Sequence, residues 1–280
     1  MIHYLEHFNG KVVYCNCDDP RWSNFVKYFQ INFEFLGLKK LIATGYRKNR
    51  RGLKLVYDSD NKDANVEELE GDGDFRSEEC VELLKQADIV VSNPPFSLAS
   101  LYMQQLIEHS KKFLIIGPLN LIKYKDTFPY FMKGQAWPGV NWVKSFTEPD
   151  GKVMKMGNVV WYTNLDHKKR HEKIVCVEKY DPVKYPKFDN YDAIEVGKYT
   201  DIPKDYAGVM GVPISYLMHH NPEQFEIVGE LNNGSDNEWD YAKPMIDGKV
   251  KYMRILIRRK PVGENGKTPA EKRKSSGTTT

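Results

Sequence analysis

The strongest constraint on the fold is a regular alternation of short apolar runs with amphipathic stretches through the first half of the chain. Apolar strands that are separated by segments of helical periodicity are typical of a parallel sheet with crossover helices. We therefore predict an α/β fold with a doubly wound, Rossmann-like sheet. The expected strands are 11–17, 39–45, 88–92 and 113–118, with a hairpin over 47–58. The expected helices are 21–37, 76–87, with Ser77 as a candidate N-cap, and 98–112.

The pattern changes after about residue 140. Three further segments have the alternation of antiparallel strands at the far edge of the sheet. Prolines and short aromatic segments follow Tyr180, a last strand is expected at 252–259, and the polar C-terminal residues are expected to be disordered. The three edge segments are 141–149, 152–164 and 172–180. We predict an α/β core at 1–177, an added irregular α+β module at 178–260 and a disordered tail at 261–280.

Composition narrows the class of protein without fixing a partner. The 280 residues carry 41 Lys and Arg against 38 Asp and Glu, a net charge of +3 that permits a nucleic-acid partner but does not require one. The four cysteines lack Cys-x-x-Cys spacing, so we expect reduced thiols and no metal site. No apolar run reaches the roughly 18 residues of a membrane span, and no signal peptide is evident. We expect a cytoplasmic protein that does not bind a membrane.

The most specific motif, Ser92-Asn93-Pro94-Pro95-Phe96, ends the third expected strand. Ligands of open parallel sheets bind beyond the carboxyl ends of the strands, where this motif would lie. The prolines fix φ, and the Asn93 amide with the Pro94 carbonyl could accept both hydrogens of an exocyclic amine. Phe96 offers a face for a planar ring. The motif predicts a receptor for an aminated ring; the alternative is a simple loop with Phe96 in the core.

This motif resembles the Asp/Asn/Ser-Pro-Pro-aromatic signature of amino-group methyltransferases that use S-adenosylmethionine. The segments VVYCNCDDPRWSNFVKYF, GDGDFRS, FLIIGPLNLIKY, MGNVVWYTNL and NPEQFEIVG follow in the order seen in the EcoRI methylase family of adenine-specific DNA methyltransferases. The resemblance covers about residues 8–260. It implies S-adenosylmethionine as cofactor, double-stranded DNA as partner and methyl transfer to a flipped-out adenine. It also implies a bacterial or phage origin, a monomer, and a separate restriction endonuclease as a partner for the same site.

The resemblance assigns roles to nine residues. Asn93, Pro94, Pro95 and Phe96 are the expected catalytic residues, and Cys17, Asp18, Asp19, Asp74 and Phe75 are the expected cofactor-binding residues. No metal is expected.

The expected cofactor loop departs from the usual pattern. The Gly-x-Gly turn common after the first strand of such enzymes is absent. Asp18 and Asp19 could instead accept hydrogen bonds from ribose hydroxyls or the methionine ammonium. Asp74 is expected to accept from the cofactor's adenine amine, with Phe75 packed on the ring. The alternative is local: Asp19 would cap a helix with Pro20 at its first position, and residues 71–75 would form an acidic turn.

Two other functions stay open on the sequence alone. The resemblance implies a longer lead-in before the first strand than MIHYLEHFNG, and that lead-in would help close the cofactor pocket. A catalytically weak or silent DNA-binding protein on a methylase fold is therefore one alternative. An RNA or protein amino-group methyltransferase is another, although it would be expected to show the glycine-rich loop and would not need the module after Tyr180.

The module at 178–260 is the expected reader of DNA. Its Lys and Arg side chains could neutralise phosphates, and its Asn and Arg side chains could read base edges. Each could equally be an ordinary solvated residue. His219 and His220, expected on a strand, would point to opposite faces and form no metal pair. The candidates are Lys198, Lys204, His219, His220, Asn221, Asn232, Asn233, Lys243, Lys249, Lys251, Arg254, Arg258 and Arg259.

Overall fold

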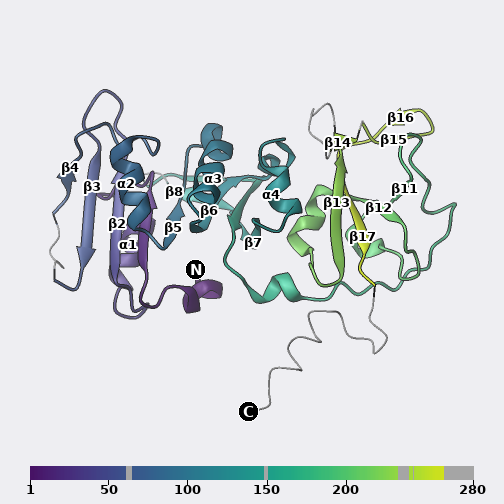
Figure 1. The fold of residues 1–280 in the computed structure, drawn as a ribbon, viewed down its shortest axis with the longest axis horizontal. Helices are drawn as coiled ribbons and strands as arrows, with labels where there is room; N and C mark the ends of the chain where they lie inside the picture. Colours follow the sequence, from purple (N-terminus) through teal and green to yellow (C-terminus); the bar gives the residue numbers. More distant parts are fainter. Residues whose placement is uncertain (61–64, 148–150, 233–239, 242, 262–280) are drawn as a thin grey trace, which may run out of the picture. The chain divides into compact units, whose positions relative to one another are not determined.

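The chain divides into two compact units. In the computed structural model, which describes residues 1–60, 65–147, 151–232, 240–241 and 243–261, the first unit comprises Met1–Leu121 and Gln135–His167 (Figure 1). The second comprises Ile122–Gly134 and the chain from Lys168 onward. We predicted a single break after residue 177. That prediction missed the segment Ile122–Gly134, which belongs to the second unit although first-unit residues flank it on both sides in the sequence. The assignment of target recognition to the second unit stays a prediction.

The first unit is built on an eight-stranded mixed sheet with the order β4-β3-β2-β1-β5-β6-β10-β7. The four strands predicted in the first half are its centre, and they pair in parallel in the order β2-β1-β5-β6. Chain order therefore reverses between β1 and β5. The strands are β1 (Val12–Asn16), β2 (Lys40–Gly45), β3 (Leu53–Asp58), β4 (Glu67–Glu68), β5 (Ile89–Ser92), β6 (Lys112–Pro118), β7 (Trp137–Trp142) and β10 (Val159–Thr163).

Helices cover this sheet through the apolar faces that the sequence indicated. Val13 on β1 belongs to the same buried cluster as Val26 and Phe29 of α1. Tyr14, the next residue of β1, points to the opposite face, where its hydroxyl interacts with Cys80 of α2. The helices are α1 (Asn24–Ile31), α2 (Glu78–Gln86) and α3 (Ala99–Glu108), with short 3₁₀ turns η1 (Ile2–His7), η2 (Phe96–Leu98) and η3 (Leu119–Lys123).

Helix boundaries show where local chemistry overrides periodicity. The predicted cap Ser77 is confirmed, because its hydroxyl accepts a hydrogen bond from Cys80 N. The predicted helix 21–37 is shorter, since Ser23 caps its start and Asn32 closes its end by a side-chain bond to Tyr28 O. The local prediction that Asp19 caps this helix was wrong: residues 20–22 form turns before it begins.

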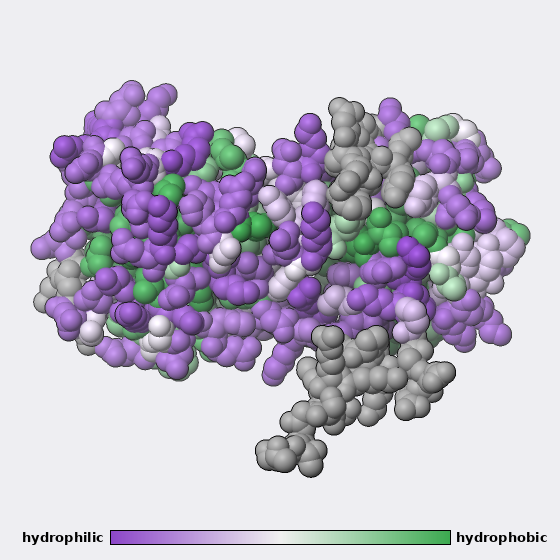
Figure 2. Space-filling model, in the orientation of Figure 1, coloured by the Kyte–Doolittle hydropathy of each residue, from purple (hydrophilic) through white to green (hydrophobic). Residues whose placement is uncertain are grey.

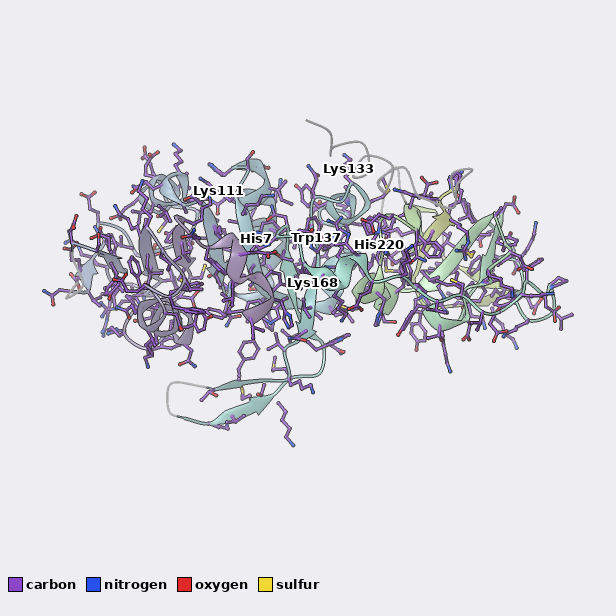
Figure 3. The ribbon with its side chains drawn as sticks, turned by 90° about the horizontal axis from the view of Figure 1, so that it is seen from below. His7, Lys111, Lys133, Trp137, Lys168 and His220 are labelled. Carbon is purple, nitrogen blue, oxygen red and sulfur yellow. The ribbon has the colours of Figure 1, made fainter. Side chains whose placement is uncertain are left out.

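The far edge of the sheet was predicted in part. β10 lies antiparallel between β6 and β7, as expected. β8 (Ser145–Thr147) and β9 (Val153–Lys155) form a separate hairpin that projects from the rest of the first unit (Figure 3). The predicted strand 172–180 was wrong, because this segment forms no strand and its Ile174 N–H bonds the side chain of Gln224.

The second unit is more regular than the predicted irregular module. Its five-stranded sheet has the order β11-β12-β17-β13-β14, and β17 confirms the last predicted strand. Phe188, Leu231 and Leu256 belong to its apolar core. The elements are α4 (Phe128–Met132), β11 (Ala193–Glu195), β12 (Val209–Pro213), β13 (Phe225–Leu231), β14 (Asp240–Tyr241), β15 (Met245–Ile246), β16 (Lys249–Val250) and β17 (Arg254–Arg259), with 3₁₀ turns η4 (Lys168–His171), η5 (Tyr199–Asp201) and η6 (Ile214–His219).

The visible surface is mainly hydrophilic. Figure 2 shows purple side chains over most of the drawn face, with apolar side chains in small separate areas. Among the residues that the structure describes, no helix combines the length and apolar composition that a membrane crossing requires. All four cysteines are free thiols, as predicted. We predicted a disordered tail at 261–280; of these residues only Pro261 is among the described ones.

Candidate active site

The predicted site residues gather at the carboxyl ends of β1 and β5, where chain order reverses. An irregular backbone marks this edge: Cys17, directly after β1, has φ +75°, which is unusual for a residue with a side chain. Asp18 follows and is buried, with 6% of its surface exposed. Asn93 follows β5, and Pro94 and Pro95 turn the chain into η2 and α3.

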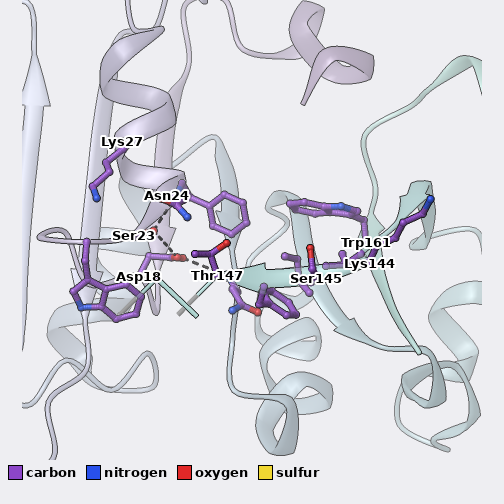
Figure 4. A pocket seen from close by; sticks show the side chains of 15 residues that line it. Asp18, Ser23, Asn24, Lys27, Lys144, Ser145, Thr147 and Trp161 are labelled. Carbon is purple, nitrogen blue, oxygen red and sulfur yellow. Dashed lines mark hydrogen bonds between the residues drawn. The ribbon is translucent and has the colours of Figure 1, made fainter. Parts of the chain in front are cut away.

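Two cavities meet at Asn93. The first, which we call the elbow cavity, has a volume of about 580 Å³ and is lined by Pro94, Pro95 and Phe96. The second, the hairpin cavity, has a volume of about 640 Å³ and is lined by residues of β8 (Figure 4). Both cavities are also lined by Trp22. All the predicted site residues except Asp18 line the elbow cavity, and Asp18 lines the hairpin cavity.

The side chain of Asn93 has an acceptor to spare. Its amide oxygen is buried and has no hydrogen-bond partner within the part of the chain that the structure describes. A buried carbonyl oxygen without a partner is costly, because it has lost its water without replacement. Because Asn93 lines both cavities, a ligand bound there could donate a hydrogen bond to this unsatisfied oxygen.

Asp18 is bonded by groups of its own chain. Its carboxylate accepts hydrogen bonds from the Ser23 hydroxyl at 2.9 Å, the Ser92 hydroxyl at 2.7 Å and Asn93 N–H at 3.4 Å. Burial raises the pKa of Asp18 to about 6, and these three donors act against that rise. We call this hydrogen-bonded set the Asp18 clamp; Figure 4 shows Asp18 and Ser23 within it.

Two further aspartates at the elbow cavity are each paired with an arginine two residues later. Arg21 bonds both carboxylate oxygens of Asp19 at 3.0 and 2.6 Å, and Arg76 bonds both oxygens of Asp74 at 2.9 and 2.6 Å. Burial pulls the pKa of Asp19 upward, but the Arg21 bonds outweigh it and hold the pKa below its usual value. The Arg76 hydrogen bonds likewise lower the pKa of Asp74. Both carboxylates therefore stay ionised and can still accept a further hydrogen bond.

Three glycines let the backbone segments beside the elbow cavity approach closely. Gly73 has φ +83°, and a Cβ atom there would lie 2.6 Å from Gly45 O. A Cβ on Gly52 would lie 2.6 Å from Gly73 N, and one on Gly45 would lie 2.7 Å from Asp19 Cα. The end of β2, the turn before β3 and the segment 71–75 can pack together only because these positions lack side chains.

Phe75 and Cys17 are more enclosed than their predicted roles suggest. Phe75 is 3% exposed and makes an edge-to-face contact with Tyr102, with ring centroids 4.9 Å apart. Burial raises the pKa of Cys17 well above its usual value, and the Asp18 carboxylate adds to the rise. Cys17 is therefore a neutral thiol at the cavity surface. Within the described ranges, no three His, Cys, Asp or Glu side chains form a group that could hold a metal ion.

Several residues of the site were not anticipated. Ser92 and Ser23 reach the Asp18 carboxylate, and Trp22 lines both cavities. Ser92 had a visible signal, because it occupies the strand end immediately before Asn93. Trp22 had none, because the sequence placed it inside the predicted helix 21–37. Other unanticipated lining residues include Lys27, Phe25, Lys144, Phe146 and Trp161 in the hairpin cavity and Tyr46 and Arg76 in the elbow cavity.

The candidate DNA-reading residues of the second unit fall into two groups. Some make internal contacts: Asn221 is buried and caps a turn through Glu223 N, and His220 bonds the Tyr216 hydroxyl. Burial lowers the pKa of His220 to about 3, so it is neutral, and it follows the 3₁₀ turn η6, not a strand as predicted. The exposed candidates are Lys198, Lys204, Lys243, Lys249, Lys251 and Arg258; Asn233 lies outside the described residues.

Among these candidates, Arg254 forms a largely buried ion pair within the second unit. Its guanidinium bonds Glu195 through Nε at 2.9 Å and Nη2 at 2.6 Å, and both side chains are only 13% exposed. We expect Arg254→Ala to lower the free energy of unfolding by about 2 kcal/mol, because Glu195 would be left without its charge partner. Denaturant unfolding checks this, with exposed Lys251→Ala as control. Equal stability of the two variants would contradict it.

The comparisons place the chain in a family. A family model described as Adenine-specific methyltransferase EcoRI matches residues 1–260. Type II methyltransferase M.EcoRI of Escherichia coli is 45% identical, over 92% of this chain and 89% of that protein. Type II methyltransferases M.MgeORF184P of Mycoplasma genitalium and M.MpnI of Mycoplasma pneumoniae are each 36% identical, over 94% and 92% of this chain and 92% and 90% of their own lengths. No solved structure matches. With the site above, these matches show that the chain belongs to the EcoRI family of adenine-specific DNA methyltransferases.

Proposed function

We propose that this protein transfers a methyl group from S-adenosylmethionine to the exocyclic amine of an adenine in double-stranded DNA. The observation that carries the proposal is the buried Asn93 amide oxygen, which has no partner among the described residues and lies where two cavities meet. Family membership supports the reaction class. An intact acceptor in the motif also argues against a catalytically silent DNA-binding protein.

The elbow cavity fits the cofactor. Its volume of about 580 Å³ lies in the range of small-molecule sites, roughly 300–1,000 Å³. Asp74 and Asp19 would accept hydrogen bonds from the adenine amine and the ribose hydroxyls, Phe75 and Tyr46 supply aromatic surface, and Cys17 is at the edge of the space. When bound there, S-adenosylmethionine supplies a methyl group activated by its positive sulfur. Asp18 is not among these ligands in our proposal, because it does not line the elbow cavity.

The motif residues would orient the target amine. The Asn93 oxygen and the Pro94 carbonyl accept the two amine hydrogens, which leaves the nitrogen lone pair free to face the methyl donor. Phe96 would stack on the adenine ring, a contact worth about 1–3 kcal/mol. Its ring lies 6.3 Å from that of Phe146, a residue of the hairpin cavity, so the aromatic pair joins residues of both cavities.

The hairpin cavity would admit the flipped-out nucleotide. Phe25 and Trp161, with ring centroids 5.6 Å apart, give it apolar surface, and Lys27 and Lys144 are among its lining residues at its rim (Figure 4). Extrusion of a base costs a few kcal/mol of unstacking, which contacts of this kind can offset. The ammonium groups would contact the phosphates on either side of the adenosine.

The proposal also covers the type of sheet in the first unit and the binding partners of the protein. The reversal of chain order between β1 and β5 supports a doubly wound, Rossmann-like sheet whose ligand crevice is at that switch point. The exposed lysines of the second unit would contact phosphates near the target site. A separate restriction endonuclease and a monomeric state stay predictions.

Methyl transfer from tritiated S-adenosylmethionine to unmethylated genomic DNA, followed by nucleoside analysis, tests the function. We expect label in N6-methyladenine. Label in RNA or in protein amides instead would favour the other amino-group methyltransferases. No label in any of these three substrates, with cofactor binding intact, would reject the proposed reaction.

Lys144→Gln tests the hairpin cavity. Loss of one phosphate contact is expected to weaken DNA binding at low salt and to reduce the slope of log affinity against log salt by about 1. Fluorescence anisotropy on labelled DNA measures both. Lys39→Gln is the matched control, because Lys39 is exposed and directly precedes β2. It therefore lies at the amino ends of the parallel strands, whereas the cavities lie at their carboxyl ends. An unchanged slope for Lys144→Gln would place the DNA elsewhere.

A further inference from the structure

We propose that Asp18 is a positioning residue for methyl transfer, which holds Asn93 through the Asp18 clamp and does not bind the cofactor. The proposal rests on the proposed function, since it names a residue that serves the same site. It replaces the role that the sequence suggested for Asp18, and it adds Ser92 and Ser23 to the residues that the reaction needs.

The clamp joins the end of β1 to the nearby start of α1 and to the end of β5, which is distant in sequence. Asp18 follows β1, Ser92 is the last residue of β5, and Ser23 is the cap of α1. The Ser23 hydroxyl donates to Asp18 and accepts from Phe25 N at 3.1 Å, so one oxygen fixes both the helix start and the carboxylate. The unusual φ of Cys17 directs the chain at Asp18 into this position.

The clamp fixes the backbone on the N-terminal side of Asn93. Asn93 N–H and the Ser92 hydroxyl both donate to the same oxygen of Asp18, at 3.4 and 2.7 Å. On the C-terminal side, Pro94 and Pro95 have fixed φ. The Asn93 side chain thus projects from a backbone that is held at both ends. Such support matters because a shift of about 1 Å in a reacting group can reduce a rate about 100-fold.

The internal partners of Asp18 distinguish this role from cofactor binding. A carboxylate that binds the methionine ammonium would need an oxygen directed at the elbow cavity, but Asp18 lines only the hairpin cavity of the two. The pair Asp19 and Asp74 lines the elbow cavity instead. The carboxylate that bonds Ser92 and Asn93 is therefore not one of the two that line the elbow cavity.

Variants at Asp18 separate the two roles. For a positioning residue, Asp18→Ala lowers kcat about 100-fold and changes the Kd for S-adenosylhomocysteine less than about threefold. Asp18→Asn keeps an acceptor for Asn93 N–H and recovers at least about tenfold of the lost kcat. If both variants instead raise this Kd tenfold or more at little cost in saturated kcat, Asp18 is a cofactor ligand and the proposal is wrong. Calorimetry gives Kd, and tritium transfer gives kcat.

Ser92→Ala supplies an independent test, because Ser92 lines neither cavity. We expect it to lower kcat in the same direction as Asp18→Ala. The double variant should be no slower than the slower single variant, since both remove one connected set of contacts. Fully additive losses would show that the two residues act separately and would overturn the clamp.

The clamp also predicts a pH dependence. Protonation of Asp18 removes acceptor capacity, so kcat should fall as the pH drops through about 6, and Asp18→Asn should lack this fall. Neighbouring groups include the thiols of Cys15 and Cys17 and the Tyr102 hydroxyl, whose pKa values are all raised well above the usual ones, and they stay neutral in this range. The charged groups nearby are the ion pair of Asp19 with Arg21 and the ammonium groups of Lys27 and Lys144. An acid limb that persists in Asp18→Asn would assign it to another group.

Hydrogen exchange tests the clamp without any activity. In Asp18→Ala, amides in a peptide that spans β5 and Asn93 should exchange faster than in the wild type, while a peptide from β17 should not change. Wild-type protein that fails to methylate DNA would reject the proposed function but leave this readout intact. Unchanged exchange at β5 would reject the clamp even in an active enzyme.

Discussion

The Asn93→Ala variant is expected to transfer methyl groups to DNA at least about a thousandfold more slowly than the wild type, a loss of about 4 kcal/mol of transition-state stabilisation. The physical reason is the lost acceptor: without the amide oxygen, one amine hydrogen has no partner and the nitrogen is no longer oriented. Removal of a single group that contacts the reacting atoms has effects of this size in other enzymes. Tritium transfer at saturating DNA and cofactor measures the loss.

Two controls make the Asn93 result interpretable. Binding of S-adenosylhomocysteine should stay within about threefold of the wild type, because Asn93 is only one of many residues that line the elbow cavity. Asn141→Ala changes an exposed amide at the end of the sheet's edge strand and should leave the rate unchanged. An Asn93→Ala enzyme that retains a tenth or more of the wild-type rate, about 1.4 kcal/mol, would contradict the proposed role.

The Gly73→Ala variant is expected to be the most damaging single-methyl change beside the elbow cavity. A left-handed backbone costs a residue with a side chain about 1–2 kcal/mol, and overpacking commonly costs a further 1–3 kcal/mol. Here the new Cβ would meet Gly45 O at 2.6 Å, a backbone atom that cannot turn away. We expect about 3 kcal/mol of destabilisation and at least a tenfold loss of cofactor affinity, since Asp74 and Phe75 would move with the backbone.

A second glycine isolates the packing contribution. Gly10 has a similar φ of +71°, but a Cβ there would meet no atom within 4 Å. Gly10→Ala should therefore show only the conformational cost and should leave cofactor binding unchanged. Denaturant unfolding and calorimetry on both variants give the comparison. Equal losses of stability, or an undisturbed cofactor Kd in Gly73→Ala, would show that the segments near the cavity separate easily.

The position of Asn93 directly after a buried strand could be predicted from the sequence because the signals for it are local. The prolines after a buried strand indicated that Asn93 lies at a strand end. Ser77, three residues before the first apolar residue of the next helix, indicated where that helix begins. Both features depend on neighbours within a few residues. The same holds for the parallel strands β1, β2, β5 and β6, whose apolar runs were long enough to recognise.

The missed features depend on contacts between distant residues. Nothing near Asp18 in the sequence reveals that a serine 74 positions later will donate to it. The segment 172–180 has apolar residues typical of a strand, yet Val175 and Val177 are 76% and 64% exposed, and the segment gained no strand partner. Arg254 looked like a DNA contact because its partner Glu195 is 59 residues away. Charge pairing of this kind is decided by the tertiary fold, which a list of basic residues does not contain.

The return of Ile122–Gly134 to the second unit limits how this protein can be divided or recombined. The chain passes between the units at three places, so no single cut yields two complete halves. A fragment that ends at His167 would keep α4, whose contacts are with β13, and would expose the buried rings of Phe128 and Phe131. Exchange of the second unit between relatives would require two coordinated grafts, because an appended or deleted C-terminal module would leave a mismatched α4 behind. If the second unit selects the target site, as predicted from the sequence, specificity would therefore change more readily by point substitution than by module exchange.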